Sequence, residues 1–180
     1  MSCAETMLNR YKDFISIKWD PNLPAMKRVI FGVYQPANEL KHLNMLEEYK
    51  IATRDSGHNY YEYDLEPTFA KWMGNLKYKE SYFERPDLIE SKLPTEYKAF
   101  IVDDIQRKIG DGLNDSNGVI FLHGTGALFG FLKVQSLLDS LTELIKGRLF
   151  VFFPGTSVEG NFRLLNAYDG WGYLASVLNE

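Results

Sequence analysis

The chain has 180 residues, of which 45% are hydrophobic and 24% are charged. This length and composition are typical of one globular domain and exclude a disordered chain. The formal net charge of −4 argues against a dedicated duplex-DNA-binding protein, because phosphate neutralisation needs a basic face.

Cysteine content and hydropathy narrow the cellular setting. Cys3 is the only cysteine, so one chain can form neither a disulfide framework nor a cysteine metal cluster. The sequence has no signal-peptide pattern and no apolar run of transmembrane length. We therefore expect a cytoplasmic protein that does not contact a membrane.

The N-terminal segment predicts an amphipathic helix. Between Ala4 and Ile17, apolar residues share one helical face: Met7, Leu8, Tyr11, Phe14 and Ile15. Asp20-Pro21 and Pro24 then end the helix. Two interpretations stay open: a helix packed across the flank of the domain, or an arm formed by residues 1–24 that detaches to bind a partner.

The next segment predicts a strand, a helix and a second strand. Arg28 to Tyr34 is an apolar run typical of an interior strand, and Gln35 to Asn38 makes a turn. Glu39 to Arg54 predicts a helix with one polar face. Tyr60 to Leu65 has the Tyr and Leu content of a second strand.

Residues 66–117 predict a helical insertion. A short apolar face begins after Pro67, and Thr95 to Leu113 predicts a longer helix. Asp103 and Asp104, which share that helix with basic residues, are interpreted as part of a solvated face.

The stretch from Gly118 to Gly155 predicts a βαβ unit. A strand over Val119 to His123 is followed by a glycine turn, a helix over Ala127 to Lys146 and a strand over Arg148 to Phe153. The whole chain therefore predicts one α/β domain, residues 1–180. We expect a Rossmann-like or flavodoxin-like three-layer fold with a mostly parallel sheet of four to five strands and a helical insertion.

The loops after the predicted strands are the candidate ligand- or partner-contact regions, because open α/β sheets bind ligands at the carboxyl ends of their strands. The candidate residues are His123, Gly124, Thr125, Gly126, Pro154, Gly155 and Thr156. The glycine pattern resembles a nucleotide-binding turn, but no acid ends the following strand and no P-loop lysine opens the helix. A tight strand-to-helix turn stays open beside a nucleotide site. In either case we expect Gly124, Gly126 and Gly155 to serve backbone conformation.

The sequence shows no assembled catalytic group. His123 ends a strand, whereas His42 and His58 lie on predicted peripheral segments, and Ser157 lacks a G-x-S-x-G nucleophile elbow. We therefore expect no catalytic residue, no metal site and no cofactor.

Three segments together resemble the BrxB-domain family of bacterial BREX (bacteriophage exclusion) defence systems. They are FLHGTGALFGFLKVQSLLDSL at 121–141, LFVFFPG at 149–155 and FRL at 162–164. The resemblance covers roughly residues 28–175, and the tail DGWGYLA at 169–175 resembles the family ending only loosely.

The resemblance implies a non-catalytic assembly subunit of an antiphage complex and assigns no catalytic residue. Its implied partners are the PglZ phosphatase-like protein and a large ATPase, and a homodimer stays open. Direct nucleic-acid binding by the chain alone is not expected. The alternative is a small-ligand or nucleotide-binding domain, or an enzyme, that uses the loops 123–126 and 154–157.

Overall fold

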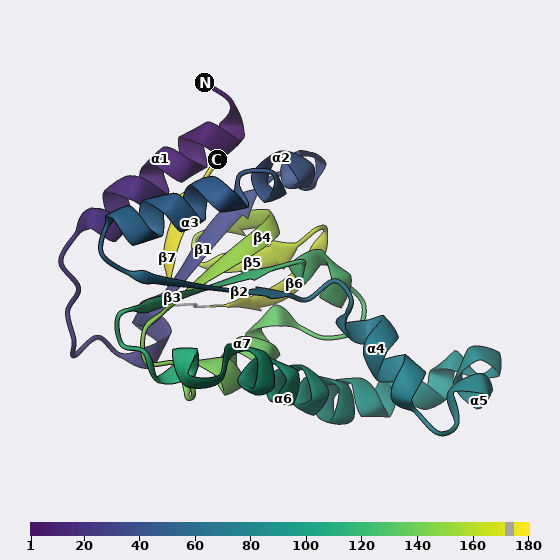
Figure 1. Cartoon of the computed structure of the whole chain (residues 1–180). Coiled ribbons are helices and arrows are strands. Elements are labelled where there is room, and N and C mark those ends of the chain that lie inside the picture. The colour runs from purple at the N-terminus through teal and green to yellow at the C-terminus, as the bar shows by residue number, and fades with distance from the viewer. Residues whose placement is uncertain (172–174) are drawn as a thin grey trace.

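A computed structural model describes residues 1–171 and 175–180, so part of the tail at 169–175 lies outside the described residues. It contains a mostly parallel sheet with helices on both faces, which confirms the predicted α/β class (Figure 1). The strands are β1 Val29–Tyr34, β2 Asn59–Asp64, β3 Gly118–His123, β4 Arg148–Val158, β5 Asn161–Leu164, β6 Ala167–Trp171 and β7 Ser176–Asn179. The α-helices are α1 Cys3–Ser16, α2 Glu39–Leu43, α3 Leu46–Asp55, α4 Thr68–Asn75, α5 Lys79–Glu84, α6 Lys98–Ile109 and α7 Val134–Thr142.

The central sheet has the order β2-β3-β4-β1-β7, and all of these neighbours pair in parallel. The chain travels from β1 to the far strand β2 across one face, then returns through β3 to β4 across the other. Right-handed crossovers require opposite faces for opposite directions of travel. Figure 1 accordingly shows α1 and α3 on one side of the sheet and α6 and α7 on the other.

Alternation along the strands divides the core into two clusters. On one face, residues such as Phe31 and Val151 pack under α6 and α7. On the other face, Ile30 and Phe150 pack against Tyr11 of α1 and its neighbours. Strands β1 and β3 are buried along their whole length. Their near-continuous apolar sequences are typical of strands that are covered on both faces.

Strand β4 is longer than the predicted strand. Beyond Pro154 it leaves the parallel sheet and pairs antiparallel with β5, with Gly155 opposite Leu164 and Thr156 opposite Arg163. The prediction of a loop at 154–157 is therefore wrong, because these residues continue strand β4.

Two predicted helices are shorter than expected. The helix predicted over 127–146 is replaced at its start by the 3₁₀ turn η6, Thr125–Leu128, and Gly130 has a φ of +79°. That left-handed conformation interrupts an α-helix, so α7 begins only at Val134. The helix predicted over 39–54 is broken between α2 and α3 at Asn44 and Met45.

The insertion at 66–117 is helical, as predicted, and α4 and α5 project from the body of the molecule (Figure 1). The 3₁₀ helix η3 Pro86–Lys92 and the π-helical turn η4 Leu93–Tyr97 lead back to α6, and the 3₁₀ helix η5 Gly110–Asn114 leads to β3. The remaining 3₁₀ helices are η1 Ala25–Arg28 and η2 Pro36–Asn38. No helix in the described part of the chain is long and apolar enough to cross a membrane.

The prediction that Asp104 of α6 belongs to a solvated face is wrong. The Asp104 side chain is only 3% exposed, and its oxygens accept hydrogen bonds from Tyr63 at 2.7 Å and from Arg107, while Lys108 Nζ lies 2.9 Å away. Burial raises the pKa of Asp104, but the bonds from Lys108, Tyr63 and Arg107 outweigh it, so the pKa lies below its ordinary value. Asp104 thus anchors α6 to β2.

Candidate functional site

The carboxyl ends of β1, β2 and β3 surround a crevice of about 420 Å³. One wall comes from η2 and α2, which lie on one face of the sheet. The other wall comes from the turns after β2 and β3, which lead to the opposite face. The crevice as a whole is lined by Pro36, Ala37, Glu39, Leu40, Leu43, Glu66, Gly124, Gly126 and Ala127. Such a junction, where neighbouring connections leave on opposite faces, is where open α/β sheets place ligands.

His123 lies at this edge with both ring nitrogens beside carboxylates of β2. Its Nε2 is 2.9 Å from Glu62 Oε1 and its Nδ1 is 3.5 Å from Asp64 Oδ1. The parallel register explains this arrangement, because Asp64 is paired with His123 and Glu62 lies two residues before it on the same face. These contacts tie β3 to β2, with a hydrogen bond at Nε2 and a longer contact at Nδ1.

The turn after His123 is shaped by close packing. Gly124 has a φ of +73°, and a Cβ there would lie 2.7 Å from Asp64 Oδ1 and 2.8 Å from Glu66 N. Thr125 is fully buried and donates its hydroxyl to the backbone oxygen of Phe152 at 2.6 Å. Both residues therefore fix the conformation of the turn. Gly124 offers only its backbone to the crevice, and the Thr125 side chain is directed to β4.

Gly126 differs from what we expected. Its φ is not in the left-handed region, and a Cβ would meet only Pro154 Cγ at an ordinary contact distance of 3.6 Å. A glycine is thus not required there for backbone conformation. At Gly155, in contrast, a Cβ would lie 1.9 Å from the backbone oxygen of Arg163, so only glycine allows β4 and β5 to pair at this point.

The charge of the crevice disfavours an anionic ligand. Glu39 and Glu66 both line it, and α7 begins too far away to offer its N-terminus to Gly124 or Gly126. Burial, followed by the negative charge of Glu66, raises the pKa of Glu39. Burial and the neighbouring Glu39 also raise the pKa of Tyr34. A phosphate at the predicted glycine turn would face these carboxylates.

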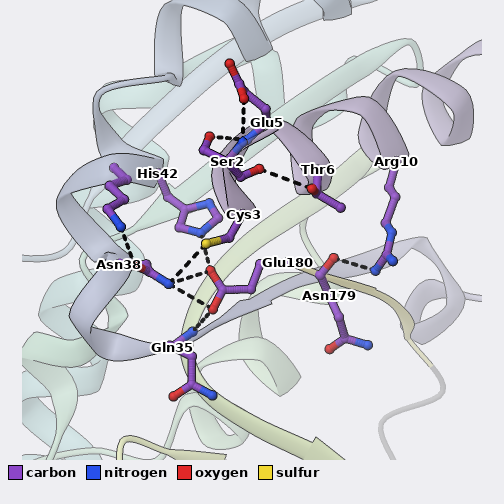
Figure 2. Close-up of polar contacts among 11 residues, drawn as sticks. Ser2, Cys3, Glu5, Thr6, Arg10, Gln35, Asn38, His42, Asn179 and Glu180 are labelled. Atoms are coloured by element: carbon purple, nitrogen blue, oxygen red, sulfur yellow. Dashed lines mark hydrogen bonds and ion pairs between the residues drawn. The ribbon is translucent and has the colours of Figure 1, made fainter.

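Glu180, which the sequence did not single out, organises the neighbouring part of this edge (Figure 2). Its carboxylate accepts hydrogen bonds from the backbone N–H of Gln35 at 2.8 Å and from Asn38 Nδ2 at 3.0 and 3.1 Å. His42 Nε2, fully buried in α2, lies 3.0 Å from the same group. Burial raises the pKa of Glu180, but the hydrogen bonds from His42, Gln35 and Asn38 lower it by a larger amount, so the net shift is downward.

These contacts fasten β7 to the rest of the sheet. Figure 2 also shows Arg10 of α1, whose Nη1 donates to the backbone oxygen of Asn179 at 2.7 Å, and the backbone N–H of Glu180 donates to Val33 at 3.2 Å. Residues about 140 positions apart meet here, which is why no local sequence pattern indicated the cluster.

A metal site at this edge would require several ligating side chains arranged around one ion. No group of three or more His, Cys, Asp and Glu side chains in the described ranges has the geometry to hold a metal ion. The seven candidate residues also do not form one surface: His123, Gly124, Thr125, Pro154 and Gly155 are buried, Gly126 is partly exposed, and Thr156 is exposed.

A second region is distinguished by exposed apolar side chains. Tyr78, Phe83 and Leu88, on or beside α5 and η3, are 61%, 67% and 45% exposed. All three residues belong to the segment at 78–88, and burying large apolar side chains against a partner is favourable. We refer to Tyr78, Phe83 and Leu88 as the projection surface.

Comparison with known proteins gives one finding. The family model described as "BREX protein BrxB" matches residues 70–175, which is more than half of the chain. No curated protein and no solved structure matches the chain.

Proposed function

Because the chain belongs to the BrxB family and is thus a component of the BREX phage-defence system, we propose that it serves as a non-catalytic assembly subunit of that system. The observation that carries this proposal is the projection surface, whose large apolar side chains are exposed. The helix α5, to which Phe83 belongs, projects from the body of the molecule (Figure 1). The contacts of His123 with Glu62 and Asp64 support the proposal, because they give the strand-end histidine a structural role in joining β3 to β2.

The proposed partners are the PglZ phosphatase-like protein and the large ATPase of the same system. We propose that one of them covers Tyr78 and Phe83, since aromatic side chains supply much of the binding energy of protein interfaces. The matched segment, residues 70–175, contains the whole projection surface, so this surface belongs to the family region. A homodimer through the same surface is the other arrangement, and the chain alone is proposed not to bind nucleic acid.

Size-exclusion chromatography with light scattering tests the proposal. The chain would be run alone and with each of the two BREX proteins from its own operon. We expect a stoichiometric complex with at least one of them. Elution of the chain unchanged in every mixture would contradict the assembly role, and a dimeric mass for the chain alone would favour self-association.

Matched variants then locate the contact. Phe83→Ser on the projection surface is expected to weaken the complex by about thirtyfold or more, the effect of losing an aromatic hot spot. Ile51→Ser is the control, because Ile51 is 51% exposed on α3, outside the projection. Equal loss of binding in both variants would argue against the projection surface as the contact.

The alternative function is a small-ligand site at the carboxyl edge, which the crevice of about 420 Å³ favours. Because Glu39 and Glu66 line the crevice, a ligand there would be cationic or rich in hydrogen-bond donors, unlike a nucleotide. A thermal-shift series with polyamines, repeated on Glu39→Gln, tests this site. Saturable stabilisation that Glu39→Gln removes would favour it over the assembly role.

A further inference from the structure

The amino edge of the sheet, opposite His123, carries a second hollow of about 430 Å³. One wall is formed by the end of α1 and the segment that follows it, and the other by residues at or just before the starts of β1, β2, β3 and β4. Figure 1 shows the connection from α1 to β1 passing the edge where the strands begin. We call this hollow the amino-edge pocket.

The amino-edge pocket is basic, although the whole chain has a net charge of −4. Four cationic side chains line it, namely those of Lys18, Arg28, Lys146 and Arg148, and Asp20 is the only acidic residue in its lining. The Asp20 carboxylate, whose Oδ1 accepts the backbone N–H of Asn22 at 2.9 Å, offsets only part of this positive charge. The local field therefore attracts anions.

Arg148 is the central group of the pocket. It is only 6% exposed, and the one hydrogen bond that it forms with the described residues is a long one, 3.5 Å from Nη2 to the backbone oxygen of Asp20. Within residues 1–171 and 175–180 it forms no ion pair with a carboxylate. Buried charges in proteins are normally paired, so an unpaired buried guanidinium indicates a missing anionic partner.

Arg28 places a second guanidinium beside the first. The pairing of Val29 with Leu149 sets Arg28 next to Arg148 at the starts of adjacent parallel strands. Arg28 Nη1 donates to the backbone oxygen of Lys146 at 2.7 Å, whereas its buried Nε has no hydrogen-bond partner among the described residues. Burial, and next the charge of Arg28, lowers the pKa of Arg148, and the negative charge of Asp20 opposes this shift only in part. An anion between the two groups would relieve this repulsion.

The pocket wall holds Arg148 in place. Its Cζ lies 4.5 Å from the centre of the Trp19 ring, and Trp19 is stacked on His58 at 3.8 Å with an interplanar angle of 6°. The hydroxyl-bearing residues Ser56 and Ser116 also line the pocket. A cation held on an aromatic face with neighbouring hydroxyl groups is a preorganised anion receptor.

We propose that the amino-edge pocket binds a small ligand through its phosphate group. The planar fork of a guanidinium matches two phosphate oxygens, which favours phosphate over a simple halide. The volume lies within the range of small-molecule sites. This role is independent of the assembly proposed above, because the pocket and the projection surface share no residue.

Isothermal titration calorimetry and thermal-shift measurements with AMP, inorganic phosphate and adenosine test the proposal. AMP is expected to bind saturably, phosphate more weakly and adenosine not at all, because the phosphate carries the recognition. Arg148→Met should weaken AMP binding about tenfold or more, the loss of a charge-assisted hydrogen bond. The same variant should melt at a higher temperature without ligand, since it removes an unpaired buried charge.

Two further variants keep the test decisive. Arg28→Gln, at a half-buried position, should also weaken AMP binding, and Lys12→Ala, exposed on α1 and outside the pocket, should leave it unchanged. Absence of saturable binding by both phosphate and AMP would overturn the proposal, as would wild-type affinity in Arg148→Met and Arg28→Gln. Tighter binding of a 5′-phosphorylated oligonucleotide than of AMP would overturn the assignment to a small ligand and point to a strand end.

Discussion

Two glycines that look equivalent in the sequence have different roles at the scale of the residue. A methyl group at Gly155 would meet the backbone of the paired strand at 1.9 Å, whereas at Gly126 it would find room. We therefore expect Gly155→Ala to lower the free energy of unfolding by about 3 kcal/mol or more, or to prevent folding. Gly126→Ala should change it by less than about 1 kcal/mol. Urea denaturation of both variants measures the difference, and equal losses would contradict it.

The buried carboxylate Asp104 gives a second prediction at this scale. Tyr63→Phe removes the 2.7 Å hydrogen bond to Asp104 and leaves the other two donors in place. A cost of about 1–3 kcal/mol is expected, since the acceptor is charged and buried. Tyr78→Phe is the matched control, because Tyr78 is 61% exposed. A loss in the control as large as in Tyr63→Phe would mean that the buried bond contributes little.

Helix α1 shows at the scale of the element how a terminal segment becomes part of the core. Its residues Met7, Tyr11 and Ile15 are buried on the sheet, and the Tyr11 hydroxyl lies 2.6 Å from Thr53 Oγ1 of α3. A capping box between Ser2 and Glu5 closes its first turn. These contacts favour a helix that opens only together with the sheet.

Native-state hydrogen exchange tests this behaviour of α1. The amides of α1 are expected to exchange with the same opening free energy as those of β1. Met7→Ala should lower the free energy of unfolding by about 2–5 kcal/mol, because it leaves a cavity under the helix. Lys12→Ala on the exposed face should change it by no more than about 0.5 kcal/mol. Faster exchange confined to α1 in the unmodified protein would instead support a detachable arm.

Buried strands could be predicted from the sequence, whereas an interruption within a helix and contacts between distant segments could not. The buried strands at 29–34 and 118–123 are continuous apolar runs, so the sequence indicated both correctly. The helix expected over 127–146 failed because its apolar spacing continues through Gly130, whose left-handed conformation a pattern of apolar residues does not reveal. The continuation of β4 past Pro154 depends on pairing with β5, and the Glu180 cluster joins segments about 140 residues apart. Neither leaves a local signal.

At the scale of the whole molecule, the two edges of the sheet carry opposite charge. The carboxyl edge presents Glu39 and Glu66, whereas the amino edge presents Arg28 and Arg148. Because open α/β sheets usually bind ligands at the carboxyl edge, the glycine turn at 124–126 was the predicted ligand site. Electrostatics favour the other edge for any phosphate, because anions are attracted to the cationic hollow and repelled by the acidic one. The net charge of −4 is a sum over the whole chain, so it does not indicate that opposite charges are separated between the two edges.

The pH dependence of stability follows from carboxylates whose pKa the fold has shifted. For Glu180 and Asp104 the hydrogen bonds outweigh the opposing effect of burial, so both folded-state pKa values lie below their ordinary values. A lowered pKa contributes stability that is present above the unfolded-state pKa and lost as the pH falls through the folded-state pKa. Glu39 acts in the opposite direction, because its raised pKa favours the protonated form in the folded protein. The pKa of Asp115 is also lowered, because hydrogen bonds from Asn59, Asn117 and Tyr61 outweigh the effect of burial. Lowered carboxylates therefore outnumber Glu39, and we expect acidification below about pH 5 to destabilise the protein.

Glu180→Gln isolates one of these contributions. The amide keeps the shape of the side chain but removes the charge that His42 and Asn38 stabilise, so the variant should lose about 1–3 kcal/mol at pH 7. Its loss of stability between pH 7 and pH 3 should be smaller than that of the unmodified protein, because the group that titrates is gone. Urea denaturation at a series of pH values measures both effects, with Glu90→Gln at an exposed position as the control. Parallel pH profiles for the unmodified protein and Glu180→Gln would show that β7 is held by its backbone pairing with β1 rather than by the Glu180 carboxylate.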